Sequence, residues 1–216
     1  RAGEVTASLG ALLAASLLTA GLMNAGPIAI ELLADESEAD EAGRFLAGLI
    51  IARVPLFLFQ AVQASLLPRL AHLAGGHQWT EFREALRRLL TVVGGIGIVA
   101  TVGAWTIGPI VITTMFGEEY ELGHRDFALL AMSSAGFMIA ITLGQSLIAL
   151  SSQAHLVLAW ATGVVTFVVV TALGDDLFLR VELGLVFGTG AVGALLGLML
   201  AAQLRSIHEA APAVAS

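Results

Sequence analysis

Six stretches of apolar residues, each about as long as a lipid bilayer is thick, fill most of this 216-residue chain. A hydrocarbon core of ~30 Å is crossed by roughly 20 helical residues at 1.5 Å per residue. The pattern predicts an all-α integral membrane protein, a bundle of six transmembrane helices. We expect these helices at about 5–34, 43–71, 89–116, 126–151, 155–174 and 178–206.

Composition also indicates a membrane protein, and it argues against several kinds of functional site. The chain is 57% hydrophobic and 12% charged, with a mean hydropathy of +0.90, which exceeds what a soluble core of this size requires. The net charge of -7 gives no reason to expect a nucleic-acid partner. There is no cysteine and no glycine-rich phosphate loop, and the five histidines lie at loops or helix ends. We therefore expect no cofactor and no metal, and not an enzyme.

The basic residues orient the predicted bundle. All ten are arginine, and short loops on one side hold more of them than loops on the other. The richer side has Arg1, Arg69, Arg83, Arg87, Arg88 and Arg205, against Arg44, Arg125 and Arg180. By the positive-inside rule both termini lie in the cytoplasm. Abundant Ala, Gly and Arg without Lys indicate a high-GC bacterium, so we expect a multi-pass protein of the bacterial cytoplasmic (inner) membrane.

One segment between the predicted spans is amphipathic. From about residue 79 to 90, Trp79, Phe82 and Leu86 recur at helical spacing, with arginines and Glu84 on the other side. This predicts a short interfacial helix. It is either a simple connector or an element that couples moving parts or binds anionic lipid headgroups. No linker is apparent, so residues 1–216 are expected to form a single six-helix domain.

Arg53 is the most informative polar residue. It lies eight residues after Phe45, where the second predicted span enters lipid, or ~12 Å along the helix and close to the bilayer midplane. An isolated guanidinium there costs at least ~2.5 kcal/mol, so it should face protein or water and meet an anion. Three interpretations stay open: contact with a substrate or cavity, an ion pair inside the bundle, and snorkelling to the outer interface.

Four amide side chains accompany Arg53 within the predicted spans. Gln60 follows Arg53 by seven residues, so both should face the same way on one helix, and Gln63 lies about one turn further on. With Asn24 on the first span and Gln145 on the fourth, they are candidates to line a hydrophilic cavity. For each amide, hydrogen bonding between helices is the alternative.

Prolines and glycines mark expected bends and close contacts. Pro27 and Pro55 each remove a backbone donor from a predicted span and are candidate hinges. Close approach of neighbouring backbones is expected at glycines four residues apart on the last span and at a group of glycines on the third. They are Gly184 and Gly188, Gly193 and Gly197, and Gly94, Gly95, Gly97 and Gly103.

Three stretches resemble a known family when taken together. They are Asn24-Ala-Gly-Pro27, the run RVPLFLFQAVQASLLPRL from Arg53 to Leu70, and Met115-Phe-Gly-Glu-Glu-Tyr120. In order and spacing, over most of residues 20–155, they resemble the polysaccharide-biosynthesis (Wzx-like) flippases of the multidrug/oligosaccharidyl-lipid/polysaccharide exporter superfamily. The last two spans resemble that family only in hydropathy.

The resemblance implies a MATE-like architecture. Such transporters have twelve or fourteen helices in two lobes around a central cavity, and this chain matches one six-helix lobe, the C-terminal one. It begins with Arg1 rather than Met, as expected of a fragment of a longer protein. Function would need a second six-helix lobe, from the same polypeptide or another copy.

The resemblance also implies a function. The family moves undecaprenyl-pyrophosphate-linked oligosaccharide across the cytoplasmic membrane by alternating access, so the expected partners are that lipid-linked glycan and membrane lipid. A guanidinium suits phosphate oxygens, which makes Arg53 the candidate for the pyrophosphate. Gln60, Gln63 and Asn24 would then contact sugar hydroxyls, and Pro27 and Pro55 would bend as the lobes rock.

Other functions stay open. A cation-coupled multidrug antiporter of the same superfamily would need an acid buried at the midplane, and none stands out in these spans. A membrane glycosyltransferase or O-antigen polymerase would be an enzyme, and usually has a large external loop, whereas the loops here are short. A further alternative is a lobe that only binds other membrane subunits.

Overall fold

The computed structural model describes residues 2–34, 39–63, 66–150 and 153–210. Within these ranges the chain is helical, with no strand. Five helices are long and apolar enough to cross a membrane, and α2 with α3 adds a sixth crossing if they are taken as one bent span. The expected all-α transmembrane character is confirmed. The helices are α1 (Ala2–Leu33), α2 (Ala39–Ala52), α3 (Val54–Gln63), α4 (Leu66–Gly75), α5 (Trp79–Phe116), α6 (His124–Ala149), α7 (Gln153–Leu173) and α8 (Leu177–Ala210), with a 3-10 turn at Glu118–Tyr120.

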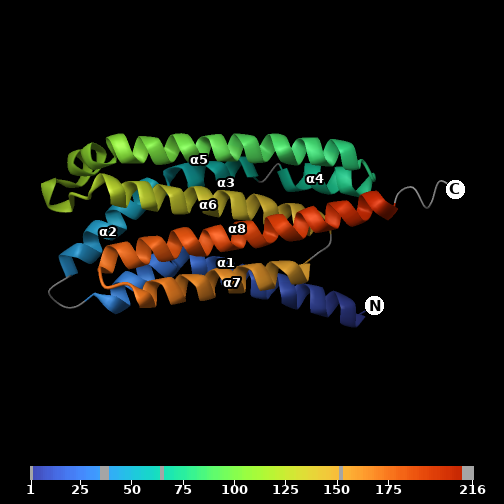
Figure 1. Ribbon diagram of the computed structural model, residues 1–216, viewed down its shortest axis with the longest axis horizontal. Coiled ribbons are helices and arrows are strands. Elements are labelled where there is room, and N and C mark those ends of the chain that lie inside the picture. Colours follow the sequence, from blue (N-terminus) through green and yellow to red (C-terminus); the bar gives the residue numbers. More distant parts are fainter. Residues whose placement is uncertain (1, 35–38, 64–65, 151–152, 211–216) are drawn as a thin grey trace.

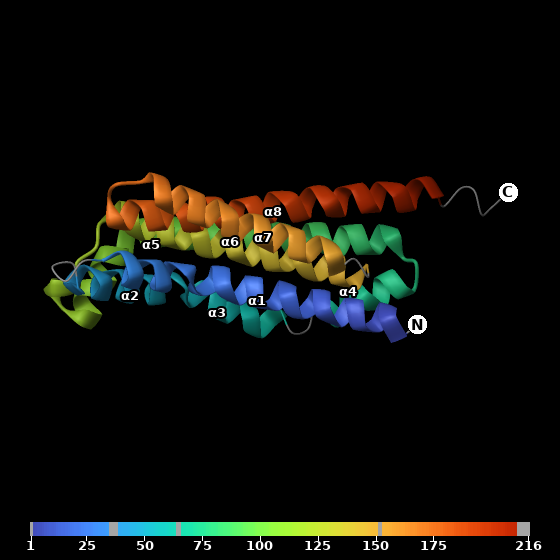
Figure 2. The same ribbon diagram turned by 90° about the horizontal axis from the view of Figure 1, so that it is seen from below.

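Helix α6 is the centre of the bundle. It packs along α5 and α8 and also contacts α2, α3, α4 and α7. The start of α1 and the end of α8 lie at the same end of the molecule (Figures 1 and 2). Arg1 lies outside the described residues, but α4, the start of α5 and the end of α8 bring the other arginines of the richer side to that same end (Figure 1).

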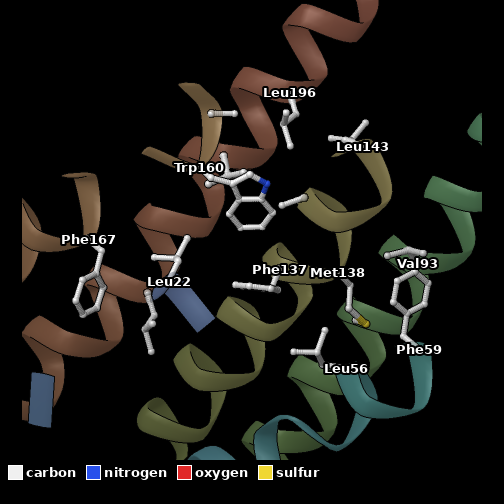
Figure 3. Close-up of a cluster of buried hydrophobic side chains, with 14 of the residues drawn as sticks. Leu22, Leu56, Phe59, Val93, Phe137, Met138, Leu143, Trp160, Phe167 and Leu196 are labelled. Atoms are coloured by element: carbon white, nitrogen blue, oxygen red, sulfur yellow. The ribbon is translucent and has the colours of Figure 1, made fainter. Parts of the chain in front are cut away.

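The buried core surrounds α6. Figure 3 shows Phe137 and Met138 of α6 among side chains from α1, α3, α5, α7 and α8, and the Phe137 and Trp160 ring centroids are 5.4 Å apart. Large apolar side chains such as Leu17, Val99 and Leu198 point outward instead and are mostly exposed. Since lipid is as apolar as leucine, close packing rather than the hydrophobic effect stabilises the contacts between helices.

Small residues let α7 and α8 approach closely. A Cβ added at Gly188 would lie 3.0 Å from the carbonyl oxygen of Gly163, and one added at Gly163 would lie 2.2 Å from Cγ2 of Val192. Gly184 packs in the same way against Thr171. The expected close packing is confirmed for Gly184, Gly188 and Gly97. It is wrong for Gly94, Gly95 and Gly103, where an added Cβ would meet nothing within 4 Å.

Two expectations about helix boundaries are wrong. There is no separate interfacial helix at 79–90, because α5 runs unbroken over 38 residues from Trp79 to Phe116. The segment is amphipathic, but Phe82 and Leu86 are buried in the bundle core rather than on a membrane surface. No proline or glycine occurs between Trp79 and Gly94, so nothing stops the helix where the surface was expected.

The second predicted span is also not a single helix. It divides into α2, α3 and α4, and the axes of α2 and α3 differ by 43°. Pro55 lacks the N–H that would bond the carbonyl of Ile51, which explains a bend at this point.

The contact between α7 and α8 makes a first prediction. Gly188→Ala should destabilise the protein by about 1–3 kcal/mol, because its methyl group meets a backbone oxygen that cannot move aside. Gly190→Ala is the matched control, since a Cβ there meets nothing within 4 Å. Thermal unfolding in detergent should show a lower midpoint for Gly188→Ala alone. Equal midpoints for both variants would contradict this packing.

Candidate functional site

Arg53 lies in the break between α2 and α3. Its N–H donates to the carbonyl of Leu49 at 3.0 Å, and its own carbonyl accepts from the N–H of Phe57 at 3.0 Å. The backbone of Arg53 is therefore satisfied, and the side chain projects from a turn rather than from either helix. The prediction that Arg53 and Gln60 share a face of one helix is wrong, because the chain changes direction between them.

The guanidinium of Arg53 bonds to a backbone group on α1. Its Nη2 donates to the carbonyl oxygen of Met23. In a regular helix that oxygen would accept from the N–H of residue 27, which is proline and has none. Arg53 thus replaces the donor that Pro27 lacks, as neighbouring helices do for prolines in membrane spans. Helix α1 continues through Pro27 to Leu33.

No carboxylate neutralises Arg53 in the part of the chain that the structure describes. The only ion pair there joins Arg125 and Asp126 at 2.9 Å. Of the three interpretations of Arg53, the ion pair inside the bundle is therefore wrong for the described residues. A carbonyl carries only a partial charge, so the half-buried guanidinium keeps its positive charge uncompensated.

A cavity of about 380 Å³ lies next to this contact, between α1, α6 and α7. It forms because α1 packs along α7 and α8 but stays apart from α6. Its walls are mainly apolar, and Met23, whose carbonyl bonds to Arg53, is part of the lining. Three polar side chains also line it: Ser16, Thr19 and Gln145.

The remaining candidate residues divide into two groups. Gln145 is half-buried in the cavity wall, as a cavity-lining role requires. Asn24 is exposed, and its amide donates to the carbonyl of Ala20 in its own helix at 2.8 Å. Gln60 is exposed and Gln63 half-buried on α3, and neither lines the cavity. Of the five candidates, Gln145 alone lines this cavity, and Arg53 is joined to it through its bond to the lining residue Met23.

Glu182 on α8 was missed by the sequence analysis. Its side chain is completely buried, and neither carboxylate oxygen has a hydrogen-bond partner. The charged groups that act on it electrostatically are Asp126 and Arg125 at the start of α6, and Asp176 just before α8. Among the described residues, no three His, Asp or Glu side chains gather so that they could hold a metal ion.

The helical phase of α8 explains why Glu182 faces inward. Phe178, one turn earlier, contacts Phe45 of α2, with ring centroids 5.7 Å apart and ring planes tilted by 54°. Leu185, one turn later, packs against Gly26 of α1. Because residues three and four apart share a helix face, Glu182 lies on the face between these contacts. The signal in the sequence was an acidic residue on the same helix face as apolar residues that are expected to be buried.

Comparisons with known proteins give no function. The chain is 26% identical over 147 residues to two curated proteins of Mycobacterium tuberculosis, the uncharacterized protein Rv1510 of strain ATCC 25618 / H37Rv and the uncharacterized protein MT1558/MT1560 of strain CDC 1551 / Oshkosh. The match covers 68% of this chain but only 33% of each relative, so the chain spans about a third of their length. No family model matches the chain, and no solved structure matches it significantly.

The bond between Arg53 and Met23 makes a second prediction, in the form of a double-mutant cycle. Arg53→Ala alone should cost about 1–2 kcal/mol of stability, because the carbonyl of Met23 is left without a donor. Pro27→Ala supplies an N–H at residue 27, so Arg53→Ala should cost much less in that background. Thermal unfolding of the four proteins measures the coupling. Additive effects would show that Arg53 does not replace the missing donor.

Proposed function

We propose that this chain is one six-helix lobe of a MATE-like transporter, with α2 and α3 forming one bent span. The transporter moves undecaprenyl-pyrophosphate-linked oligosaccharide across the bacterial cytoplasmic membrane by alternating access, with both termini in the cytoplasm. The single observation that carries the proposal is the uncompensated charge of Arg53 beside the cavity between α1, α6 and α7.

The chemistry of Arg53 suits an anionic group. A guanidinium has five N–H donors in a planar fork, and the carbonyl of Met23 takes only one of its nitrogens. The fork matches the oxygens of a phosphate, and the remaining positive charge favours an anion over a neutral ligand. A pyrophosphate placed there would supply the counter-charge that the described residues do not.

The cavity walls suit the rest of such a substrate. Hydroxyl and amide groups of Ser16, Thr19 and Gln145 can bond to sugar hydroxyls, and apolar walls tolerate a lipid chain. A volume of about 380 Å³ is near the lower limit for small-molecule sites. A lipid-linked oligosaccharide is larger, so one lobe supplies only part of the binding surface and a second lobe, from the same polypeptide or another copy, completes it.

The bend at Arg53 supports a moving part at this place. A helix interrupted by proline bends more readily than a continuous one, and here the interruption carries the proposed ligand residue. Rocking of the lobes would alter the angle between α2 and α3 and the position of Arg53 together. Pro55 acts in this proposal as the bending point, whereas α1 continues as one helix through Pro27.

Transport assays that separate binding from stability make the third prediction. In the Pro27→Ala background, where residue 27 supplies its own N–H, Arg53→Gln should abolish translocation of lipid-linked oligosaccharide in vesicles of the intact protein. Arg53→Lys should keep partial activity, since it keeps the charge but not the fork. Arg88→Gln, an exposed arginine, is the control. Normal translocation by the Pro27→Ala, Arg53→Gln protein would remove Arg53 from the site.

Glu182 favours a second candidate function, cation-coupled antiport of small molecules. A carboxylate buried without a partner is costly, and a cation that binds beside it would compensate the charge. The buried acid that such a transporter needs is thus available, near the start of α8 rather than at the midplane.

Gradient-driven transport distinguishes the two candidates and makes the fourth prediction. If the protein is a cation-coupled antiporter, Glu182→Gln should abolish drug transport driven by an imposed Na⁺ or H⁺ gradient in proteoliposomes, and should not lower stability. Glu31→Gln, at an exposed glutamate of α1, should leave transport unchanged. Gradient-driven transport that survives in Glu182→Gln would exclude this carboxylate as the coupling site.

A further inference from the structure

A groove separates α5 from α8 on another side of the bundle from the candidate site. Two adjoining cavities of about 400 Å³ each share Leu86 and Leu90 of α5 and Leu204 of α8 as lining. The first turns of α5 and the last turns of α8 lie at the same end of the molecule (Figures 1 and 2). Ile139 and Leu143 of α6 line the inner cavity. The groove exists because α5 and α8 both pack on α6 and not on each other.

The groove is apolar inside and basic at its mouth. The inner cavity is lined by leucine, isoleucine, alanine and glycine, whereas Arg83 and Arg87 line the outer one. On α8 the lining runs from Gly197 to Leu204, about 10 Å along the helix. One leaflet of the hydrocarbon core is about 15 Å deep. The groove is therefore long enough to hold an acyl chain over most of one leaflet, and its arginines lie at one end.

The two arginines keep their charge available. Arg83 donates through Nη2 to the carbonyl of Leu204 at 2.6 Å, which holds its guanidinium across the mouth of the groove. Arg87 is exposed at the same mouth. Neither forms an ion pair within the part of the chain that the structure describes. Glu84, on the same helix, is exposed and does not line the groove.

We propose that this groove binds one anionic phospholipid. Its phosphate contacts the guanidinium groups of Arg83 and Arg87, and one acyl chain lies along Leu90, Leu143 and Leu200. The site is distinct from the cavity beside Arg53, and it does not depend on the transported substrate.

The geometry favours a lipid over a protein partner. A transmembrane helix is about 10–12 Å wide with its side chains, and the bond from Arg83 to Leu204 joins α5 to α8 across the mouth. That bond leaves no room for a helix to enter between them, whereas a single acyl chain is far narrower. The basic mouth selects among lipids, because arginines near the membrane surface attract anionic headgroups.

Two neighbouring arginines give a matched test and the fifth prediction. Arg87→Gln and Arg88→Gln remove the same charge from adjacent exposed positions of α5, but only Arg87 lines the groove. Native mass spectrometry of the intact protein, exchanged into equal amounts of phosphatidylglycerol and phosphatidylcholine, counts the retained lipids. We expect preferential retention of phosphatidylglycerol, reduced about fivefold by Arg87→Gln and unchanged by Arg88→Gln.

A variant at the inner end tests the acyl-chain part separately. A Cβ at Gly197 meets only Leu143 Cδ1, at 3.8 Å, so Gly197→Phe should fill the cavity with its ring. It should reduce retention of both lipids in protein that stays monodisperse. Equal loss of phosphatidylglycerol in Arg87→Gln and Arg88→Gln would indicate general surface attraction and overturn the site. Unchanged retention in Arg87→Gln or in Gly197→Phe would overturn it as well.

Discussion

The hydrogen bond from Arg53 to the carbonyl of Met23 links the main features of this structure. Pro27 on α1 has no N–H to donate to the carbonyl of Met23, and Arg53 supplies a donor instead. Arg53 lies in the break that Pro55 creates between α2 and α3. Each proline alone would leave a backbone carbonyl without its usual donor in a lipid environment. The bond ties α1 to the bent span near the cavity, and it holds a positive charge there that the described residues do not neutralise.

Much of the fold could be predicted because membrane insertion imposes a simple length rule. Apolar runs of about 20 residues predicted α1, α5, α6, α7 and α8, and most of the predicted helix ends lie within a few residues of the observed ones. The rule fails where the backbone is interrupted or overlong. The length rule predicted one helix over α2 and α3, although Pro55 marks the break between them. It also divided α5 into two helices, although no glycine or proline before Gly94 would stop that helix.

The candidate site was less accessible from sequence, because it depends on which helices meet. The midplane position of Arg53 signalled an unusual residue, but its partner on α1 follows only from tertiary packing. Pro27 does identify the carbonyl of residue 23 as unpaired, so half of that contact was present in the sequence. Glu182 was missed because it lies within a span whose average hydropathy is apolar. Only its position on the same helix face as Phe178 and Leu185 indicates that it points inward.

In the proposed function, the charge of Arg53 is available to an anionic group of a lipid-linked substrate. Equilibrium binding of undecaprenyl pyrophosphate and of undecaprenol to the intact protein tests it most directly, since the two ligands share the same chain and differ only in the anion. We predict a clear preference for the pyrophosphate, which Arg53→Gln removes even when Pro27→Ala restores the bond to Met23. Equal affinity for both ligands, or a preference that survives without Arg53, would show that Arg53 does not bind the pyrophosphate.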